Sequence, residues 1–298
     1  MSKPFVKWAG GKYRLSERLI PLMPKEFDPS KNTYIEPMVG SGGFFFNYNP
    51  KRAYLSDINK NLITTYNVIK NDVENLIDNL KKYKKLHNQA YFEKQRKLFN
   101  KLIKKGENEL EIASLFIYLN KTCFNGLYRE NSKGEFNVPI GAYKNPLICD
   151  EENLLSVNKT LQSIEIGCHS YEKSINKIKK GDFVYIDPPY IPIDLTSFTK
   201  YSKDDFGENE HIELSNFCDR IDSKGAFYML SNSDTKKTRD IYFTVKEEQG
   251  QFLIFEDINE QRFSDQFLVS RSISSNAKKR NKAKELIITN YKIQKNVV

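Results

Sequence analysis

The chain has 298 residues, enough to bury a substantial core in one or two domains. Its 47 Lys and Arg residues exceed its 38 Asp and Glu residues, and the net charge of +9 favours a polyanionic partner. The four cysteines and three histidines are widely spaced, which argues against a metal site or a disulfide framework, and no apolar run is long enough to span a membrane.

The first motif is the segment 5–12 (Phe-Val-Lys-Trp-Ala-Gly-Gly-Lys), which predicts a compact turn before an amphipathic helix over residues 15–22. Its glycines let a ligand approach the backbone closely, while Trp8 offers a stacking face and Lys12 a positive charge. Taken alone, Trp8 is better explained as an anchor of the hydrophobic core.

Two predicted strands follow, and each ends in residues suited to ligand binding. Residues 33–36 precede the glycine-rich turn 40–43 and an apolar helix, which is the layout of a nucleotide-binding loop. The turn lacks a complete G-x-G-x-x-G and a Walker lysine, so a phosphate cradle is disfavoured. Residues 53–57 end on Asp57, whose carboxylate is placed either to bind ribose hydroxyls or to cap the helix predicted to reach about Ile69.

A helical and then an irregular region separate these strands from the rest of the sheet. Residues 72–105 carry a charged helical pattern with a solvated lysine face, and an apolar helix over 111–119 is expected to pack behind it. The apolar positions of the charged stretch are Leu76, Leu80, Tyr83 and Leu86. Asn-Gly and Lys-Gly turns within 120–141 predict a hairpin or loop, whose exposed aromatic side chains beside Arg129 and Lys133 suit nucleic-acid contact.

The remaining sequence predicts the second half of an α/β sheet. Strands are expected over 162–168, 183–187, 226–232, 242–247 and 286–291, and helices over 174–179 and 210–221. A polar loop, 194–205, is expected to lie over the site. The basic, hydroxyl-rich stretch 270–284 suits phosphate binding, although a solvated basic loop explains it equally well.

The central motif is Asp187-Pro188-Pro189-Tyr190, at the end of a short apolar strand. Neither proline offers a backbone N–H, so the strand stops there and leaves its polar groups at the carboxyl edge, where open α/β sheets bind ligands. A carboxylate and a proline carbonyl can accept both hydrogens of an exocyclic amino group and direct its lone pair towards an incoming methyl group. Tyr190 adds a face for stacking a base. A Pro-Pro turn with a capping aspartate is the structural alternative.

The motifs occur together in the order and spacing of one family. They are residues 5–12, 36–42, 56–59, 124–129 (Phe-Asn-Gly-Leu-Tyr-Arg), 136–139 (Phe-Asn-Val-Pro), 187–190 and 230–233 (Leu-Ser-Asn-Ser). In this arrangement the chain resembles, nearly end to end, the Dam-like (DpnM-type) site-specific DNA adenine-N6 methyltransferases.

The resemblance implies an α/β fold: a Rossmann-like S-adenosylmethionine-dependent methyltransferase sheet with a helical and β-hairpin DNA-recognition insert. The catalytic domain would be discontinuous, residues 1–66 and 151–298, and the insert would span 67–150. The implied cofactor is S-adenosyl-L-methionine and no metal is expected. Its implied ligands are Trp8, Lys12, Glu36, Gly40, Gly42, Asp57 and Asp187. The implied catalytic residues, which hold a flipped-out adenine, are Asp187, Pro188 and Tyr190.

The family commonly modifies the adenine of GATC, and the resemblance implies how this chain would read that site. Lys7 and Arg129 would meet guanines, Leu127 and Pro139 would face thymine methyl groups, and Phe124 would wedge into the base stack. Some relatives carry tyrosine at the wedge, but insertion requires only the ring. Residues 249–266 match the family pattern poorly and receive no role.

The sequence therefore predicts a monomeric DNA adenine-N6 methyltransferase acting on double-stranded DNA in the cytoplasm of a bacterium, or encoded by a phage. It would serve a restriction-modification system, with a cognate restriction endonuclease acting on the same site, or a Dam-type system. Two alternatives stay open. One is an amino-group methyltransferase acting on cytosine, RNA or a protein amide. The other is a catalytically silent DNA-binding module.

Overall fold

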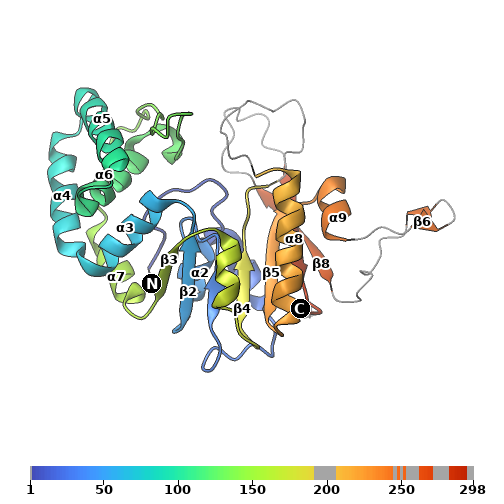
Figure 1. Cartoon of the computed structure of the whole chain (residues 1–298). Helices are drawn as coiled ribbons and strands as arrows, with labels where there is room; N and C mark the ends of the chain where they lie inside the picture. The colour runs from blue at the N-terminus through green and yellow to red at the C-terminus, as the bar shows by residue number, and fades with distance from the viewer. Residues whose placement is uncertain are drawn as a thin grey trace.

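A computed structural model gives the structure of residues 2–190, 206–243, 247–248, 251–252, 262–270 and 282–293. In these ranges seven strands form one sheet in the order β3-β2-β1-β4-β5-β9-β8, with helices on both faces (Figure 1). The first five strands in that order run parallel, whereas β9 is antiparallel to β5 and β8 is antiparallel to β9. The predicted α/β sheet is confirmed.

The strands of this sheet are β1 (Tyr34–Glu36), β2 (Ala53–Asp57), β3 (Glu165–Cys168), β4 (Phe183–Ile186), β5 (Phe227–Ser233), β8 (Phe263–Ser270) and β9 (Lys282–Thr289). A separate small pair joins β6 (Glu247–Glu248) to β7 (Gln251–Phe252). The α-helices are α1 (Tyr13–Leu19), α2 (Gly43–Tyr48), α3 (Lys60–Asn71), α4 (Val73–Leu86), α5 (Gln89–Lys105), α6 (Glu109–Thr122), α7 (Glu151–Leu161), α8 (Glu208–Ser223) and α9 (Lys236–Tyr242). Short 3-10 turns are η1 (Ile20–Leu22), η2 (Phe124–Gly126) and η3 (Tyr171–Asn176).

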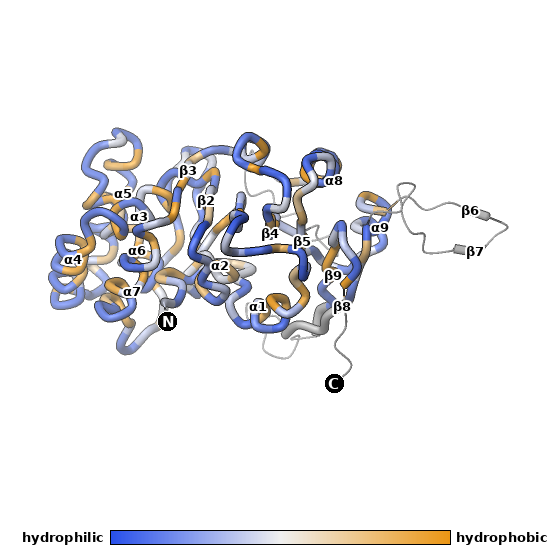
Figure 2. Tube along the Cα trace, turned by 90° about the horizontal axis from the view of Figure 1, so that it is seen from below, coloured by the Kyte–Doolittle hydropathy of each residue, from blue (hydrophilic) through white to orange (hydrophobic). Residues whose placement is uncertain are grey.

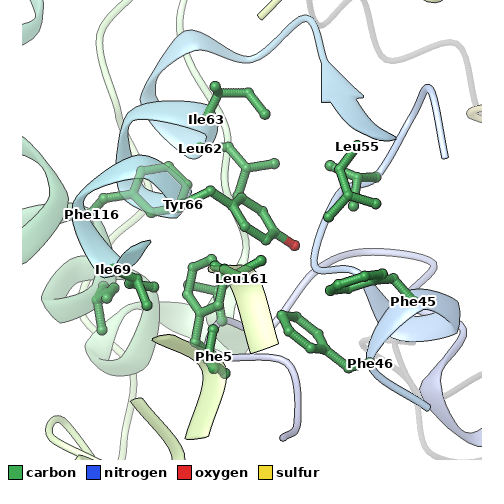
Figure 3. Close-up of a cluster of buried hydrophobic side chains, with 14 of the residues drawn as sticks. Phe5, Phe45, Phe46, Leu55, Leu62, Ile63, Tyr66, Ile69, Phe116 and Leu161 are labelled. Atoms are coloured by element: carbon green, nitrogen blue, oxygen red, sulfur yellow. The ribbon is translucent and has the colours of Figure 1, made fainter. Parts of the chain in front are cut away.

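Both faces of the sheet are buried, as its near-continuous apolar strands require. Alternate strand residues point to opposite faces, so Tyr185 joins the core under α2 and α3 while Val184 and Ile186 join the core under α8. Tyr66 of α3 lies among the aromatic and aliphatic side chains of the first core (Figure 3). Its hydroxyl donates to the carbonyl of Gly40 at 3.1 Å, which joins the core to the glycine-rich loop.

The carboxyl ends of the five parallel strands lie at one edge of the sheet. The chain moves outward from β1 in one direction through β2 and β3, and in the other through β4 and β5. The point where the direction reverses lies between β1, which ends at Glu36, and β4, which is followed by Asp187. Antiparallel pairing of Ser233 with Glu285 brings the start of β9 to the same edge. Ligands bind at such a switch point in open α/β sheets.

The helices α3 to α6 form a bundle beside the sheet, in which α6 contacts α3, α4 and α5 (Figure 1). Along α4 and α5 short apolar and polar stretches follow one another, as expected for helices with one buried face (Figure 2). Asn88 and Asn108 cap α5 and α6 through their side chains, and Gly106 ends α5 in a left-handed conformation. The predicted boundary between the catalytic domain and the insert, residues 66 and 67, lies inside helix α3, which continues across it without interruption.

The irregular segment after α6 is a loosely paired loop with bridges between Cys123 and Ile140 and between Glu130 and Phe136. The Asn100 side chain of α5 accepts from the Phe136 N–H at 2.9 Å and donates to its carbonyl at 3.1 Å. The Phe136 ring packs against Phe99 and Tyr128 and is 2% exposed, so the expectation of exposed aromatic side chains in this segment does not hold for it. Of the apolar positions in the charged helical stretch, Leu76, Leu80 and Tyr83 are buried, whereas Leu86, the last residue of α4, is 53% exposed.

Several predicted boundaries changed. The helix expected over 174–179 is the turn η3, and the strand expected over 162–168 begins only at Glu165, because a turn after α7, a helix that was not predicted, occupies residues 162–163. Tyr242, the expected start of a strand, ends α9. The loop 194–205 and most of the basic stretch 270–284 lie outside the described residues. No helix of the described part of the chain combines the length and apolarity needed to cross a membrane.

Candidate active site

Asp187 lies directly after β4, where it forms an ion pair with Lys12 from the turn before α1. The Lys12 ammonium is 2.8 Å from Oδ1 and 3.0 Å from Oδ2 of Asp187, and it also donates to the Gly10 carbonyl at 2.7 Å. Asp187 Oδ1 is buried and makes no directional hydrogen bond. The ion pair joins residues 175 positions apart in sequence, and it brings together two of the residues that the resemblance places at the cofactor.

Tyr190 and Glu285 complete this cluster. The Tyr190 hydroxyl donates to Glu285 Oε1, and Lys12 Nζ lies 3.6 Å from the same oxygen. Lys12 Nζ also lies 4.6 Å from the centroid of the Tyr190 ring, which places the ammonium over one face of that ring. The ring is therefore held at its hydroxyl by Glu285 and on one face by Lys12.

Burial dominates the electrostatics of the two carboxylates. It raises the pKa of Asp187, against the opposing attraction of the Lys12 ammonium. Burial also raises the pKa of Glu285, where Lys12 and Tyr190 oppose it and the charge of Asp187 adds to it. The Lys12 ammonium is thus shared by two carboxylates, both of which are poorly solvated.

Glu36 ends β1 and is 2% exposed, the most deeply buried acid of this edge. It accepts a hydrogen bond of 2.6 Å from the Tyr34 hydroxyl. Burial raises its pKa to about 8, the negative charges of Asp187 and Asp57 add to the increase, and the Tyr34 hydrogen bond opposes it. This dependence on both acids shows that the ends of β1, β2 and β4 form one electrostatic unit.

Asp57 ends β2 and orders the glycine-rich loop. Its Oδ2 accepts from the Gly40 N–H at 3.0 Å and its Oδ1 from the Asn59 N–H at 2.9 Å. Burial raises the pKa of Asp57, and these backbone hydrogen bonds oppose the increase. The side chain that caps α3 is Asn59, which accepts from the Leu62 N–H, so the alternative of Asp57 as the helix cap was wrong.

Trp8 and the two loop glycines form a close-fitting wall. Gly40 has φ +48, and a Cβ there would lie 2.8 Å from Trp8 Cδ1; Gly42 has φ +68, and a Cβ there would lie 2.8 Å from the Tyr66 hydroxyl. Only glycine suits these positions. The Trp8 ring stacks on Tyr128 at 5.9 Å and is only partly buried, so it is both an edge of the core and a wall of the site.

These residues fit S-adenosylmethionine on chemical grounds. The cofactor carries a sulfonium and an amino group, and in the described part of the chain this edge gathers the acidic side chains of Asp187, Glu285, Glu36 and Asp57 around Lys12. Poorly solvated acidic groups are stabilised in their charged form by a positively charged ligand. Among the described residues, no group of three or more His, Cys, Asp or Glu is arranged to hold a metal ion.

The residues predicted to read DNA gather at the irregular segment after α6, residues 123–141, which we call the recognition loop after its predicted role. Lys7, Phe124, Arg129 and Pro139 are exposed, and Leu127 is partly buried. The Phe124 N–H donates to the Pro139 carbonyl at 2.8 Å, and Phe124 is 46% exposed despite its apolar ring. Arg129 lies farther along the hairpin, where its Nε donates to Asn137 Oδ1 at 2.8 Å. The geometry brings the five residues to one loop and its neighbour, the segment before α1.

Sequence reasoning missed Glu285. The available signal was an acid before the apolar run Leu286-Ile287-Ile288, where a carboxylate costs stability unless it is paired. Glu285 is 6% exposed, and its partners come from Lys12 and Tyr190, which are distant in sequence.

Comparison with known proteins gives consistent results. A family model described as D12 class N6 adenine-specific DNA methyltransferase matches residues 8–252. The type II methyltransferase M.MjaIII of Methanocaldococcus jannaschii is 43% identical over 243 residues, covering 78% of this chain and 84% of its own. The type II methyltransferase M1.LlaDCHI of Lactococcus lactis is 35% identical, covering 97% and 95%. A DNA adenine methylase of Haemophilus influenzae is 37% identical, covering 96% and 92%.

Proposed function

The chain belongs to the D12 class of N6 adenine-specific DNA methyltransferases, and from this premise we propose that it methylates the adenine of GATC in duplex DNA after turning that base out of the helix. The observation that carries the proposal is the cluster of Asp187, Lys12, Tyr190 and Glu285 at the switch point of the sheet. Extrusion follows from chemistry, because a paired adenine hides its amino group.

The end of β4 would hold the target amino group. Asp187 and the carbonyl of Pro188 are two hydrogen-bond acceptors at the same strand end, so they match the two N6 hydrogens. With both hydrogens bound, the lone pair points out of the base plane towards the methyl donor. The Tyr190 ring, fixed in place by Lys12 and Glu285, would stack the extruded base.

Other residues would position the donor. When bound, S-adenosylmethionine supplies a methyl group made electrophilic by its positively charged sulfur. Asp57 would accept the ribose hydroxyls, and Glu36 and Asp187 would favour the positive charge by the field of their carboxyl groups. Trp8 and Gly40 would close the wall of the pocket and exclude water.

The proposal also assigns catalysis and DNA recognition to different parts of the chain. Residues 1–66 and 151–298 would form the catalytic domain and 67–150 the recognition insert. Lys7 and Arg129 would read guanines, Leu127 and Pro139 the thymine methyl groups, and Phe124 would fill the space left by the extruded base. On this proposal the enzyme acts on DNA as a monomer in the cytoplasm. It would serve either beside a cognate endonuclease or in a Dam-type system.

The direct test is transfer of labelled methyl groups from S-adenosylmethionine to two duplexes that differ only in GATC or GTAC. Label in adenine of the GATC duplex alone is the expected result. Equal labelling of both would retain the chemistry but overturn the assigned recognition residues. Labelling of neither, together with label in cytosine, RNA or protein, would favour a different substrate, and cofactor binding without any turnover would favour a DNA-binding module.

Two substitutions of Tyr190 are expected to lower kcat/KM to different extents. Tyr190→Phe keeps the stacking ring and loses the hydrogen bond to Glu285, so kcat/KM should fall only a few-fold. Tyr190→Ala removes the ring and should cost about 1–3 kcal/mol, the usual value of stacking one base. Steady-state kinetics on the GATC duplex measure both. Equal losses in the two variants would show that the ring does not stack the target.

Arg129 offers a prediction about sequence discrimination. Arg129→Ala should reduce discrimination at one guanine by about 1–3 kcal/mol, the value of a bidentate contact to a guanine edge. The measurement is kcat/KM on GATC and on duplexes with single-base changes. Lys133→Ala, which removes an exposed charge from the same loop, is the control and should affect all duplexes alike. An unchanged preference in Arg129→Ala would refute the contact.

A further inference from the structure

Asn120, in the last turn of α6, connects two segments that are far apart in sequence. Its Oδ1 accepts from the Lys7 N–H at 2.8 Å, and its Nδ2 donates to the Lys7 carbonyl at 2.8 Å and to the Gly126 carbonyl at 2.9 Å. The residue is 1% exposed, so both amide hydrogens and its oxygen are used inside the protein. Asn120 therefore fixes the backbone of Lys7 against the recognition turn η2.

Packing reinforces this connection. Gly126 has φ +64, and a Cβ there would lie 2.4 Å from Lys7 Cδ and 2.6 Å from Lys7 Cβ, so the Lys7 side chain lies directly on the turn. Beyond the turn, the Lys7 ammonium donates to the Tyr143 hydroxyl at 3.1 Å and lies 4.3 Å from the centre of that ring. The position of the Lys7 charge thus depends on the turn beneath it.

The next residue extends the connection to the cofactor side. Trp8 stacks on Tyr128, which lies between Leu127 and Arg129, and Asn61 of α3 donates to the Tyr128 hydroxyl at 3.0 Å. Trp8 also faces Gly40 in the glycine-rich loop. The recognition loop is therefore attached at two adjacent positions, Lys7 and Trp8, to the segment that leads into Lys12.

We propose that Asn120 is a positioning residue for sequence discrimination: it holds Lys7 at a fixed place relative to η2, although it is too buried to touch DNA itself. This inference rests on the proposed function, since it takes Lys7 and the loop as the reader of the recognition sequence. A shift of one segment against the other would misalign contacts whose value depends on bidentate geometry.

The test compares Asn120→Asp with Asn158→Asp. Asn120→Asp keeps the acceptor for the Lys7 N–H and replaces both donors with an oxygen facing two carbonyls. Asn158 is the matched control, because its Nδ2 also donates to two carbonyls, those of Ile69 and Lys70, at 2.8 and 2.9 Å. It lies on α7, away from the recognition loop (Figure 1).

The readout is the ratio of kcat/KM on GATC to kcat/KM on duplexes with single-base changes. A loss of folded enzyme lowers both values equally, so a merely structural role leaves the ratio unchanged. In Asn120→Asp the ratio should fall roughly tenfold or more at the pair read by Lys7. In Asn158→Asp it should stay within about twofold of wild type, since nothing in its contacts reaches the loop.

Gly126→Ala gives a second, independent perturbation, because the added methyl group must displace Lys7 while leaving Asn120 intact. It should also lower the ratio. Wild-type ratios retained in both Asn120→Asp and Gly126→Ala would overturn the inference. If wild-type enzyme itself methylates all duplexes equally, the proposed GATC specificity fails instead, and that result is visible before any variant is made.

Discussion

Replacing Asp187 with alanine is expected to lower the rate of methyl transfer by roughly 100-fold or more, comparable to the loss of one preorganised polar group at a reacting centre. The variant loses the acceptor for one N6 hydrogen, so the lone pair is no longer directed at the methyl group. It also leaves Lys12 with Glu285 as its remaining carboxylate at this edge. Affinity for duplex DNA should change only a few-fold, because the contacts assigned to the rest of the recognition sequence come from Lys7 and the recognition loop and remain in place.

Single-turnover methylation and equilibrium duplex binding measure the two quantities separately. Asp182→Ala is a suitable control, since Asp182 lies at the opposite end of β4, is 3% exposed and accepts from the N–H groups of Thr33 and Lys179, each at 2.8 Å. It should destabilise the sheet without affecting turnover per folded molecule. Substantial turnover in Asp187→Ala, comparable to that control, would remove Asp187 from its assigned role.

A second large effect is expected in the pH dependence of stability. The pKa of Glu36 is about 8 in the folded protein because the side chain is buried, against a reference value of 4.5. Between these values the unfolded chain has lost its proton while the folded chain keeps it, so stability falls as pH rises from about 4.5 to 8. Below that window both states are protonated and the cost disappears.

Glu36→Gln should remove this dependence. The amide keeps an oxygen for the Tyr34 hydroxyl but has no proton to lose, so the variant should become more stable than wild type as pH rises, by at most about 5 kcal/mol above pH 8. Denaturant unfolding of the cofactor-free proteins between pH 4.5 and 8 measures the difference. Glu111→Gln, which alters a similar bond to the Tyr83 hydroxyl, is the control. Parallel curves for wild type and Glu36→Gln would contradict the raised pKa.

The sequence identified the parts of the site that depend on short-range pattern. Strand ends such as Asp57 and Asp187 follow apolar runs, and their common edge follows from parallel topology, so their meeting could be predicted. Glu285 could not be found in this way, because its place depends on the antiparallel register of β9 against Ser233 of β5. That register is a tertiary property, set by pairing between strands more than fifty residues apart.

Burial was the other property that local pattern did not reveal. Phe124 and Phe136 both lie in the loop and look alike in sequence, yet one is exposed and the other is enclosed through the hydrogen bonds of Asn100. Likewise, α7 was not predicted, although Asp150 caps it by accepting from the Asn153 N–H. Its apolar residues Leu154, Val157 and Leu161 have helical spacing but follow a stretch that reads as a loop.

The attachment of Lys7 and Trp8 to the recognition loop bears on how new specificities could arise. A chimaera that exchanged only residues 67–150 between relatives would import α4 to α6 and the hairpin, but would retain the host's Lys7, Trp8 and Asn61 beneath them. Each of these contacts would then join a residue of one parent to a residue of the other. If Lys7 and the insert read DNA as we propose, a graft that transfers specificity has to carry the segment around Lys7 together with the insert.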